Sequence, residues 1–325
     1  MENSTKNLTL ASILTSLFVV ITIIALSTGI GYGIYLDFCV PIYFALVYLK
    51  CGKKYTILSG IVSVVLVFMI VGDLAGALFV SQSFLLGVIC AYFMDKDSIL
   101  MEDVFFASIL GTFLMLLIDL YTRGLTGYSL ITEFQEMANW MPYKDYLNFF
   151  FYLLISFYVG GMCFCVYYIS LFLGKRLKIL TENAEKKYYV FRNLKVFNRF
   201  LCLRRGTFYT CVAYILIIEL LNLLNIEIKL VYLRVVLISI EYLAYYYLFR
   251  DSIIIIQDYI LTRSRKVSYV RLFMLAVIVP LFFVFKIEFL ILSIVSYIID
   301  VKNQIRIHQK KIVDLHYEKV TCRKS

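Results

Sequence analysis

The residues of this chain that are best suited to chemistry are charged side chains inside long apolar runs. Glu219 and Arg234 lie at equal steps on either side of a predicted turn at Ile226–Glu227. Glu241 follows Arg234 by seven residues, which is two turns along the same helix face. Because a lone charge in a membrane is costly, the spacing predicts an ion pair between Glu219 and Arg234, with Glu241 beside it. This cluster is either a structural clasp or part of a proton or substrate path.

A second set of polar residues lies in the first half of the chain. Asp37, Asp73 and Asp119 each fall near one end of an apolar run, and Gln82 lies about two turns into another. Together they could line an outward cavity with an acidic mouth, which suits a cationic or hydrogen-bonding substrate better than an anion. Acidic residues are also ordinary at helix ends, so the four are candidate substrate-binding residues only.

The sequence lacks the usual signatures of catalysis and metal binding. The only histidines, His308 and His316, follow the last apolar run, and no HExxH motif or Ser–His pair occurs. Gly29-Ile30-Gly31-Tyr32-Gly33 has the glycines of a phosphate-binding loop but not its lysine, and we interpret it as a tight outer turn. We therefore expect no enzyme activity, catalytic residue, metal or cofactor, and any transport needs an ion gradient or an energising subunit.

The elements that position these residues follow from composition. Apolar residues make up 62% of the 325 residues and charged residues 17%, against about 45–50% and about 25% in an average soluble domain. The apolar runs are about 20 residues long, enough to cross about 30 Å of hydrocarbon. Continuous runs predict helices, so we expect an all-α, polytopic transmembrane bundle of about ten spans. The predicted spans are residues 8–30, 33–49, 55–72, 74–93, 104–121, 149–173, 207–225, 230–262, 270–283 and 287–299.

Charge distribution predicts the orientation of these spans. With the N-terminus in the cytoplasm, the outside segments hold only Arg123, Lys144, Lys229 and Lys286 of the 32 basic residues. Apart from two arginines within a span, the rest lie inside, which is the positive-inside pattern of a multi-pass protein. We therefore expect a cell-membrane protein with both termini cytoplasmic. Its net charge of +10 reflects topology, and no nucleic-acid partner is expected.

The spans divide into six and four around a basic joint. The predicted domains are a six-span membrane domain (1–174), a cytoplasmic amphipathic joint (175–206), a four-span membrane domain (207–300) and a basic cytoplasmic tail (301–325). Val190, Leu194, Phe197 and Leu201 recur in the joint at helical spacing. This basic amphipathic stretch could lie on anionic inner-leaflet lipids or form a docking surface for a cytoplasmic partner.

Two other segments have open interpretations. The predicted outer segment 122–147 carries Glu133, Glu136 and Trp140, and it could be an interfacial helix or a lid over an outward cavity. In the first span, small residues recur four apart, which lets another helix approach closely. They serve either internal packing or contact with a partner subunit. These residues are Ala11, Ser12, Thr15 and Ser16.

Short motifs throughout the chain carry a family resemblance. They are Asn7-Leu8-Thr9-Leu10-Ala11, Val40-Pro41-Ile42, Leu49-Lys50-Cys51-Gly52, Gly72-Asp73-Leu74-Ala75-Gly76, Leu85-Leu86-Gly87, Gly174-Lys175-Arg176-Leu177 and Ile299-Asp300-Val301-Lys302. In these the chain resembles the YybS-type multispanning proteins of Gram-positive bacteria, a family without an established function.

The first six spans also resemble the substrate-binding S component of energy-coupling factor transporters. S components are six-helix vitamin- or metal-binding proteins that dock on a T component and two ATPases through an Ala-xxx-Ala motif in helix one. The corresponding positions here are Ala11 and Thr15, so the second departs from alanine. The resemblance implies solute binding from outside, with transport energised by another subunit. The alternative is a scaffold or regulatory protein whose joint and tail recruit a cytoplasmic partner.

Overall fold

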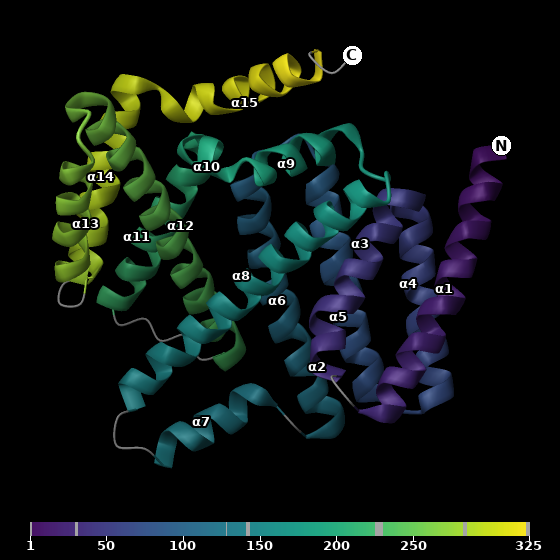
Figure 1. Cartoon of the computed structure of the whole chain (residues 1–325). Helices are drawn as coiled ribbons and strands as arrows, with labels where there is room; N and C mark the ends of the chain where they lie inside the picture. Colours follow the sequence, from purple (N-terminus) through teal and green to yellow (C-terminus); the bar gives the residue numbers. More distant parts are fainter. Residues whose placement is uncertain are drawn as a thin grey trace. The chain divides into compact units, whose positions relative to one another are not determined.

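A computed structural model describes residues 2–29, 32–127, 129–140, 144–224, 230–281 and 285–322 (Figure 1). Within these ranges the chain is helical and contains no strand. The chain forms two compact units. Unit 1 comprises Met1–Ser98, Asp103–Tyr188 and Ile228–Ile240, and unit 2 comprises Ile99–Glu102, Tyr189–Glu227 and Glu241–Ser325. The predicted turn at Ile226–Glu227, and Ile30 and Gly31 of the predicted outer turn, lie outside the described residues.

Unit 1 is built mainly from helices α1 to α9 and a π-helical segment between α2 and α3. They are α1 (Glu2–Thr28), α2 (Tyr32–Ile34), a π-helical segment (Tyr35–Cys39), α3 (Val40–Cys51), α4 (Lys53–Val71), α5 (Leu74–Asp95), α6 (Leu100–Thr126), α7 (Leu130–Trp140), α8 (Lys144–Arg176) and the first part of α9 (Glu182–Arg192). The start of α12 (Val231–Ser264) completes the unit.

Unit 2 contains most of the chain from Tyr189 onward. Its helices are α10 (Leu194–Phe197), a short 3-10 turn (Asn198–Phe200), α11 (Arg205–Leu223), most of α12, α13 (Val267–Leu281), α14 (Phe285–Asn303) and α15 (Ile305–Cys322). Ile256, Val277 and Leu292, from α12, α13 and α14, share one buried apolar cluster.

Seven described helices are long and apolar enough to cross a membrane. They are Thr5–Thr28, Lys53–Val71, Leu74–Asp95, Leu100–Thr126, Phe150–Arg176, Arg205–Leu223 and Val231–Ser264. Each coincides with a predicted span, which confirms a helical, multi-pass membrane protein. The remaining predicted spans correspond to the interrupted α2–α3 region, to the 15-residue α13 and to α14. The count of ten therefore stays a prediction.

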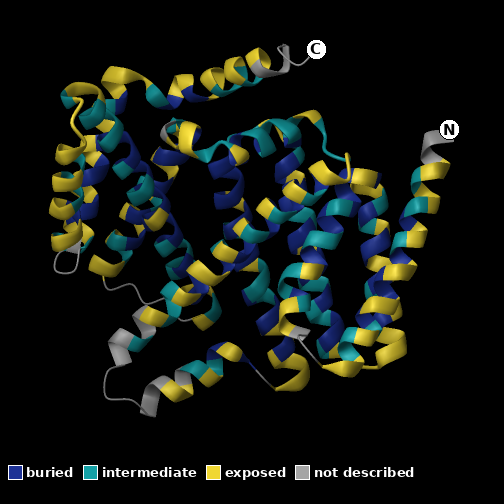
Figure 2. Ribbon diagram, in the orientation of Figure 1, coloured by how far each residue is buried: buried dark blue, intermediate teal, exposed yellow. Residues whose placement is uncertain are grey.

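Exposed apolar side chains agree with a lipid environment. Met69 on α4 is 74% exposed and Leu272 on α13 is 67% exposed, and many other large apolar residues of the described helices are also exposed. Figure 2 shows exposed residues along the outer faces of α1, α4 and α13. A soluble protein rarely exposes contiguous apolar surface on this scale, whereas a bilayer covers it without cost.

Small residues bring the helices of unit 1 close together. A Cβ atom on Gly87 of α5 would lie 2.3 Å from the Pro41 carbonyl oxygen of α3, so only glycine permits this approach. Beside it, the Phe44 ring makes edge contacts with Phe18 of α1 and Phe84 of α5, each at a centroid distance of 4.8 Å. This aromatic cluster forms the centre of the unit's apolar core.

The small residues of α1 divide between two faces. Ala11 is buried against Val47 and Cys51, and the Thr15 hydroxyl lies 2.5 Å from that of Ser59 on α4. This pair therefore serves internal packing. The other pair, Ser12 and Ser16, is exposed, and each hydroxyl donates to a carbonyl of its own helix. Only this second face remains open to lipid or to a partner.

The amphipathic joint differs from its prediction. It is not one helix, because α9 ends at Arg192 before the short α10 and the 3-10 turn. Its apolar residues Val190, Phe197 and Leu201 are buried in the protein. The Phe197 ring meets the His316 ring of α15 edge-on at 5.2 Å. Three of the four apolar residues of the joint are therefore covered by protein, while Leu194 is half-buried and Val196 is exposed. Contact of the joint with inner-leaflet lipids or with a cytoplasmic partner stays a prediction.

Candidate functional site

A cavity of about 910 Å³ lies within unit 1. Its walls come from the π-helical segment, α5, α6, α7 and α8. Three of the four predicted substrate-binding residues line it, namely Asp37, Gln82 and Asp119. Its volume is at the upper end of the usual range for small-molecule sites. Three residues chosen from the sequence therefore share one cavity, and their role in substrate binding stays a prediction.

Asp37 lies in the π-helical segment between α2 and α3. Such one-turn widenings of a helix are rare and occur often at functional sites. The Tyr158 hydroxyl of α8 donates a hydrogen bond to Asp37 Oδ2. The carboxylate is half-buried on the cavity wall, where one oxygen is held by the protein. Within the described residues, Oδ1 accepts no hydrogen bond, so it can receive one from a ligand.

Asp119 uses both carboxylate oxygens to hold the beginning of α7. Oδ1 accepts from the Leu130 backbone N–H at 2.9 Å, and Oδ2 accepts from the Ser129 hydroxyl at 2.7 Å. The Tyr232 hydroxyl donates to the same Oδ2 at 3.2 Å. Because three donors engage its two oxygens and it is buried, Asp119 is a positioning residue of the cavity.

Helix α7 forms one wall of the cavity. Ile131 is buried against Leu116 and Ile155, and the Phe134 ring stacks on Phe151 at a centroid distance of 4.1 Å and an angle of 12°. Glu133 and Glu136 lie on the cavity side and remain exposed. The arrangement favours the lid interpretation of this segment over a helix that only lies on the membrane surface. The side chain of Trp140 lies outside the described residues.

Asp73 does not line the cavity. It is the N-cap of α5, and its carboxylate accepts hydrogen bonds from the backbone N–H groups of Ala75 and Gly76, each at 3.0 Å. Aspartate is a preferred residue at this position because it satisfies otherwise unpaired amides. The expectation that Asp73 belongs to a substrate site is therefore corrected to a capping role.

The cavity is acidic on an apolar background. Four carboxylates line it, from Asp37, Asp119, Glu133 and Glu136, while the described lining contains no lysine, arginine or histidine. Phe79, Phe134, Phe151 and Tyr158 supply aromatic walls. The convergence of these four rings could not be predicted from the sequence, since aromatic residues occur in every predicted span. No group of three His, Cys, Asp or Glu side chains suited to a metal ion occurs among the described residues.

The predicted charge cluster of the second half is arranged differently from expectation. Glu219 of α11 forms an ion pair with Lys286 of α14 at 2.6 Å and accepts a hydrogen bond from the Tyr245 hydroxyl at 3.2 Å. Glu241 of α12 is buried within unit 2. Arg234 is exposed and belongs to unit 1. The cation beside Glu219 is thus Lys286. Because the spacing around the turn at Ile226–Glu227 relates only residues on either side of that turn, it could not predict a partner on α14.

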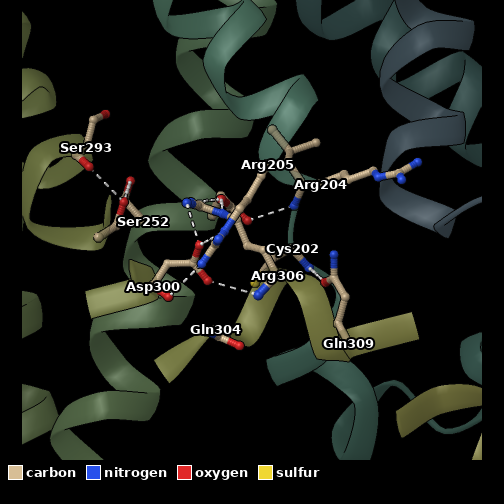
Figure 3. Close-up of polar contacts among 12 residues, drawn as sticks. Cys202, Arg204, Arg205, Ser252, Ser293, Asp300, Gln304, Arg306 and Gln309 are labelled. Atoms are coloured by element: carbon tan, nitrogen blue, oxygen red, sulfur yellow. Dashed lines mark hydrogen bonds and ion pairs between the residues drawn. The ribbon is translucent and has the colours of Figure 1, made fainter. Parts of the chain in front are cut away.

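A buried ionic cluster fixes the tail helix within unit 2 (Figure 3). The guanidinium of Arg306 is fully buried and forms an ion pair with Asp251 of α12, with Nε 3.1 Å from Oδ2. The Arg306 backbone N–H donates to Asp300 Oδ1 at 2.9 Å, and Arg205 Nε donates to Asp300 Oδ2 at 2.9 Å. Gln309 Oε1 accepts from the Cys202 backbone N–H at 3.0 Å. The tail is therefore a packed helix, α15, rather than a free basic arm.

Lys187 of α9 forms a second buried ion pair, in unit 1. Its ammonium lies 2.7 Å from Asp103 Oδ2 and donates to the carbonyls of Phe93 at 2.6 Å and Lys96 at 2.5 Å, at the end of α5. Tyr167 donates to the same Asp103 oxygen at 2.8 Å. Burial lowers the pKa of Lys187, and the negative charge of Asp103 partly offsets that effect.

Comparison with known proteins gives no assignment. No protein-family model matches the chain, and no curated protein or solved structure matches it significantly. Function is therefore argued from the membrane-spanning helices and the cavity.

Proposed function

We propose that this multi-pass protein of the cell membrane binds a small solute in the cavity of unit 1 and helps to transport it. The observation that carries the proposal is a cavity of about 910 Å³ whose apolar walls enclose a few convergent polar groups. Cavities of this kind are the usual form of small-molecule sites. The basic-residue pattern favours an orientation in which the cavity opens outward and both termini are cytoplasmic.

The energy for transport comes from another subunit in this proposal. The sequence contains no P-loop motif, and its resemblance to S components suggests an external ATPase module. Ala11 and Thr15 are occupied in packing within unit 1. A partner helix would therefore use the exposed Ser12 and Ser16 face of α1.

A matched pair of methionine substitutions tests the proposal. Met115 lines the cavity, whereas Met69 is exposed on the lipid-facing side of α4. We expect a library of small solutes to contain compounds that raise the unfolding temperature of the purified full-length protein in nanodiscs. Met115→Trp should remove that shift by filling the cavity, and Met69→Trp should leave it intact. No stabilising compound, or a full shift in Met115→Trp, would overturn the proposal.

The second candidate function is that of a scaffold recruiting a cytoplasmic partner. One observation favours it: α15 exposes Ile307, Leu315 and Lys311 while Arg306 and Gln309 anchor its other face. Deleting the tail would disturb the buried cluster, so surface variants are the better test. Ile307→Ser with Leu315→Ser should remove a specific partner from a pull-down while the unfolding temperature stays near that of the unmodified protein. An unchanged set of captured proteins would reject the scaffold function.

A further inference from the structure

The charge and shape of the cavity together restrict its ligand. All four ionisable lining residues that could carry charge at neutral pH are carboxylic acids, and the remaining polar groups are an amide and a tyrosine hydroxyl. An anion would meet repulsion from every charged wall, and a neutral ligand would leave the carboxylates without a counter-charge. The electrostatic complement of this site is a cation.

The apolar walls indicate that the cation is organic. Phe79, Phe134 and Phe151 line the same space as the carboxylates. Aromatic faces attract ammonium groups and also remove the apolar part of a ligand from water. The described residues offer no three-ligand group for a bare metal ion, and the volume far exceeds what such an ion would fill.

The carboxylates differ in their availability to a ligand. Asp119 is engaged by three donors, from Ser129 and Leu130 at the start of α7 and from Tyr232 of α12, so its role is to hold the start of α7 in place. Glu133 and Glu136 lie exposed on α7, where solvent weakens their attraction for a charge. Asp37 is half-buried, is oriented by Tyr158, and has one oxygen available. It is therefore the principal counter-ion.

We infer that the cavity takes a small organic cation, an ammonium group on an apolar body, with its charge against Asp37 and its body between the aromatic walls. The inference rests on the proposed solute-binding function and names its substrate class. Glu133 and Glu136 form an outer acidic rim that attracts the cation toward the cavity.

Three probes that share one body test the inference. They are 4-phenylbutylamine, which is protonated at neutral pH, the neutral 4-phenylbutanol and the anionic 4-phenylbutyrate. Binding to the full-length protein in zwitterionic nanodiscs is measured by calorimetry, with empty nanodiscs as the blank. We expect saturable binding of the amine, at least about tenfold tighter than that of the alcohol, and no binding of the acid.

Charge-removing variants locate the counter-ion. Asp37→Asn should weaken amine binding about tenfold, and Asp314→Asn on α15, outside the cavity, should leave it unchanged. The double variant Glu133→Gln with Glu136→Gln should weaken it by a smaller factor and reduce its salt dependence. If Asp37→Asn does not fold, this double variant and the probe series still decide the question.

The outcomes separate the two proposals. Tighter binding of the alcohol or the acid, or amine binding that is unaffected by every carboxylate variant, would overturn the organic-cation inference while leaving solute binding in place. The solute library can also yield only neutral or anionic ligands whose binding is lost in Met115→Trp. That result would likewise overturn the organic-cation inference and leave solute binding in the cavity in place. If no compound binds at all, the proposed function itself fails.

Discussion

At the scale of single residues, a buried arginine ties the tail helix α15 to the rest of unit 2. Arg306 has two carboxylate partners, Asp251 and Asp300, in a part of unit 2 where water does not reach its guanidinium. The guanidinium also lies 3.9 Å from the Phe208 ring centroid. Removing one partner of such a cluster leaves uncompensated charge, which costs more than the intact cluster contributes.

The first prediction concerns the cost of removing the cation from this buried cluster. Arg306→Leu should lower the free energy of unfolding by about 3–5 kcal/mol, because the buried carboxylate of Asp251 loses its cation, while Asp300 keeps only Arg205. Lys311→Leu, on the exposed side of the same helix, should change it by less than about 1 kcal/mol. Denaturant unfolding in detergent, followed by circular dichroism, measures both. Equal effects of the two variants would contradict the assigned role of Arg306.

A second residue-scale prediction concerns pH. The pKa of Lys187 is lowered in the folded protein, so the unfolded chain binds more protons between that lowered value and about 10.4. The free energy of unfolding contributed by Lys187 should therefore rise with pH in this window. Lys187→Arg does not titrate there, so wild-type stability should increase relative to this variant as pH rises. If the free energy of unfolding of the wild type minus that of Lys187→Arg stays constant or falls as pH rises, the lowered pKa of Lys187 is wrong.

At the scale of elements, α7 is the part of the cavity that is best placed to move. Among its described side chains, α7 is held at its start, where Asp119 accepts from Leu130 and Ser129, and at Phe134, which stacks on Phe151. A helix of 11 residues opens at a lower free-energy cost than the long packed helices α6 and α8 beside it. This is the property that a lid requires.

Two matched Asp→Ala substitutions test the lid. Asp119→Ala should speed amide exchange across α7 about tenfold, because a buried set of hydrogen bonds is lost. Asp73→Ala should instead loosen the start of α5 by about 1 kcal/mol and leave α7 unchanged. Hydrogen exchange with mass spectrometry resolves the two segments. Unchanged exchange of α7 in Asp119→Ala would show that other contacts hold it.

At the scale of the whole molecule, the orientation in the membrane is the central prediction. Glu182 of α9 has an 80% exposed side chain in the segment expected inside, and Glu133 is exposed in the segment expected outside. In intact cells, a membrane-impermeant maleimide should label Glu133→Cys and leave Glu182→Cys unlabelled, relative to the unsubstituted chain. Labelling of Glu182→Cys from outside would reverse the topology, and with it the outward cavity.

The sequence by itself determined that the chain is a helical membrane protein, because apolar runs of spanning length have no other stable arrangement in lipid. It also identified Asp37, Gln82 and Asp119, since polar groups in such runs are conspicuous. The Asp73 cap is local, because the carboxylate accepts from Ala75 and Gly76, and aspartate before an apolar run is its sequence signal. Only the tertiary structure decided the long-range contacts, which gave Glu219 the cation of Lys286 and placed Phe197 of the joint against His316 of α15. These two contacts join residues distant in the chain, and periodicity along one helix specifies a face without specifying what packs against it.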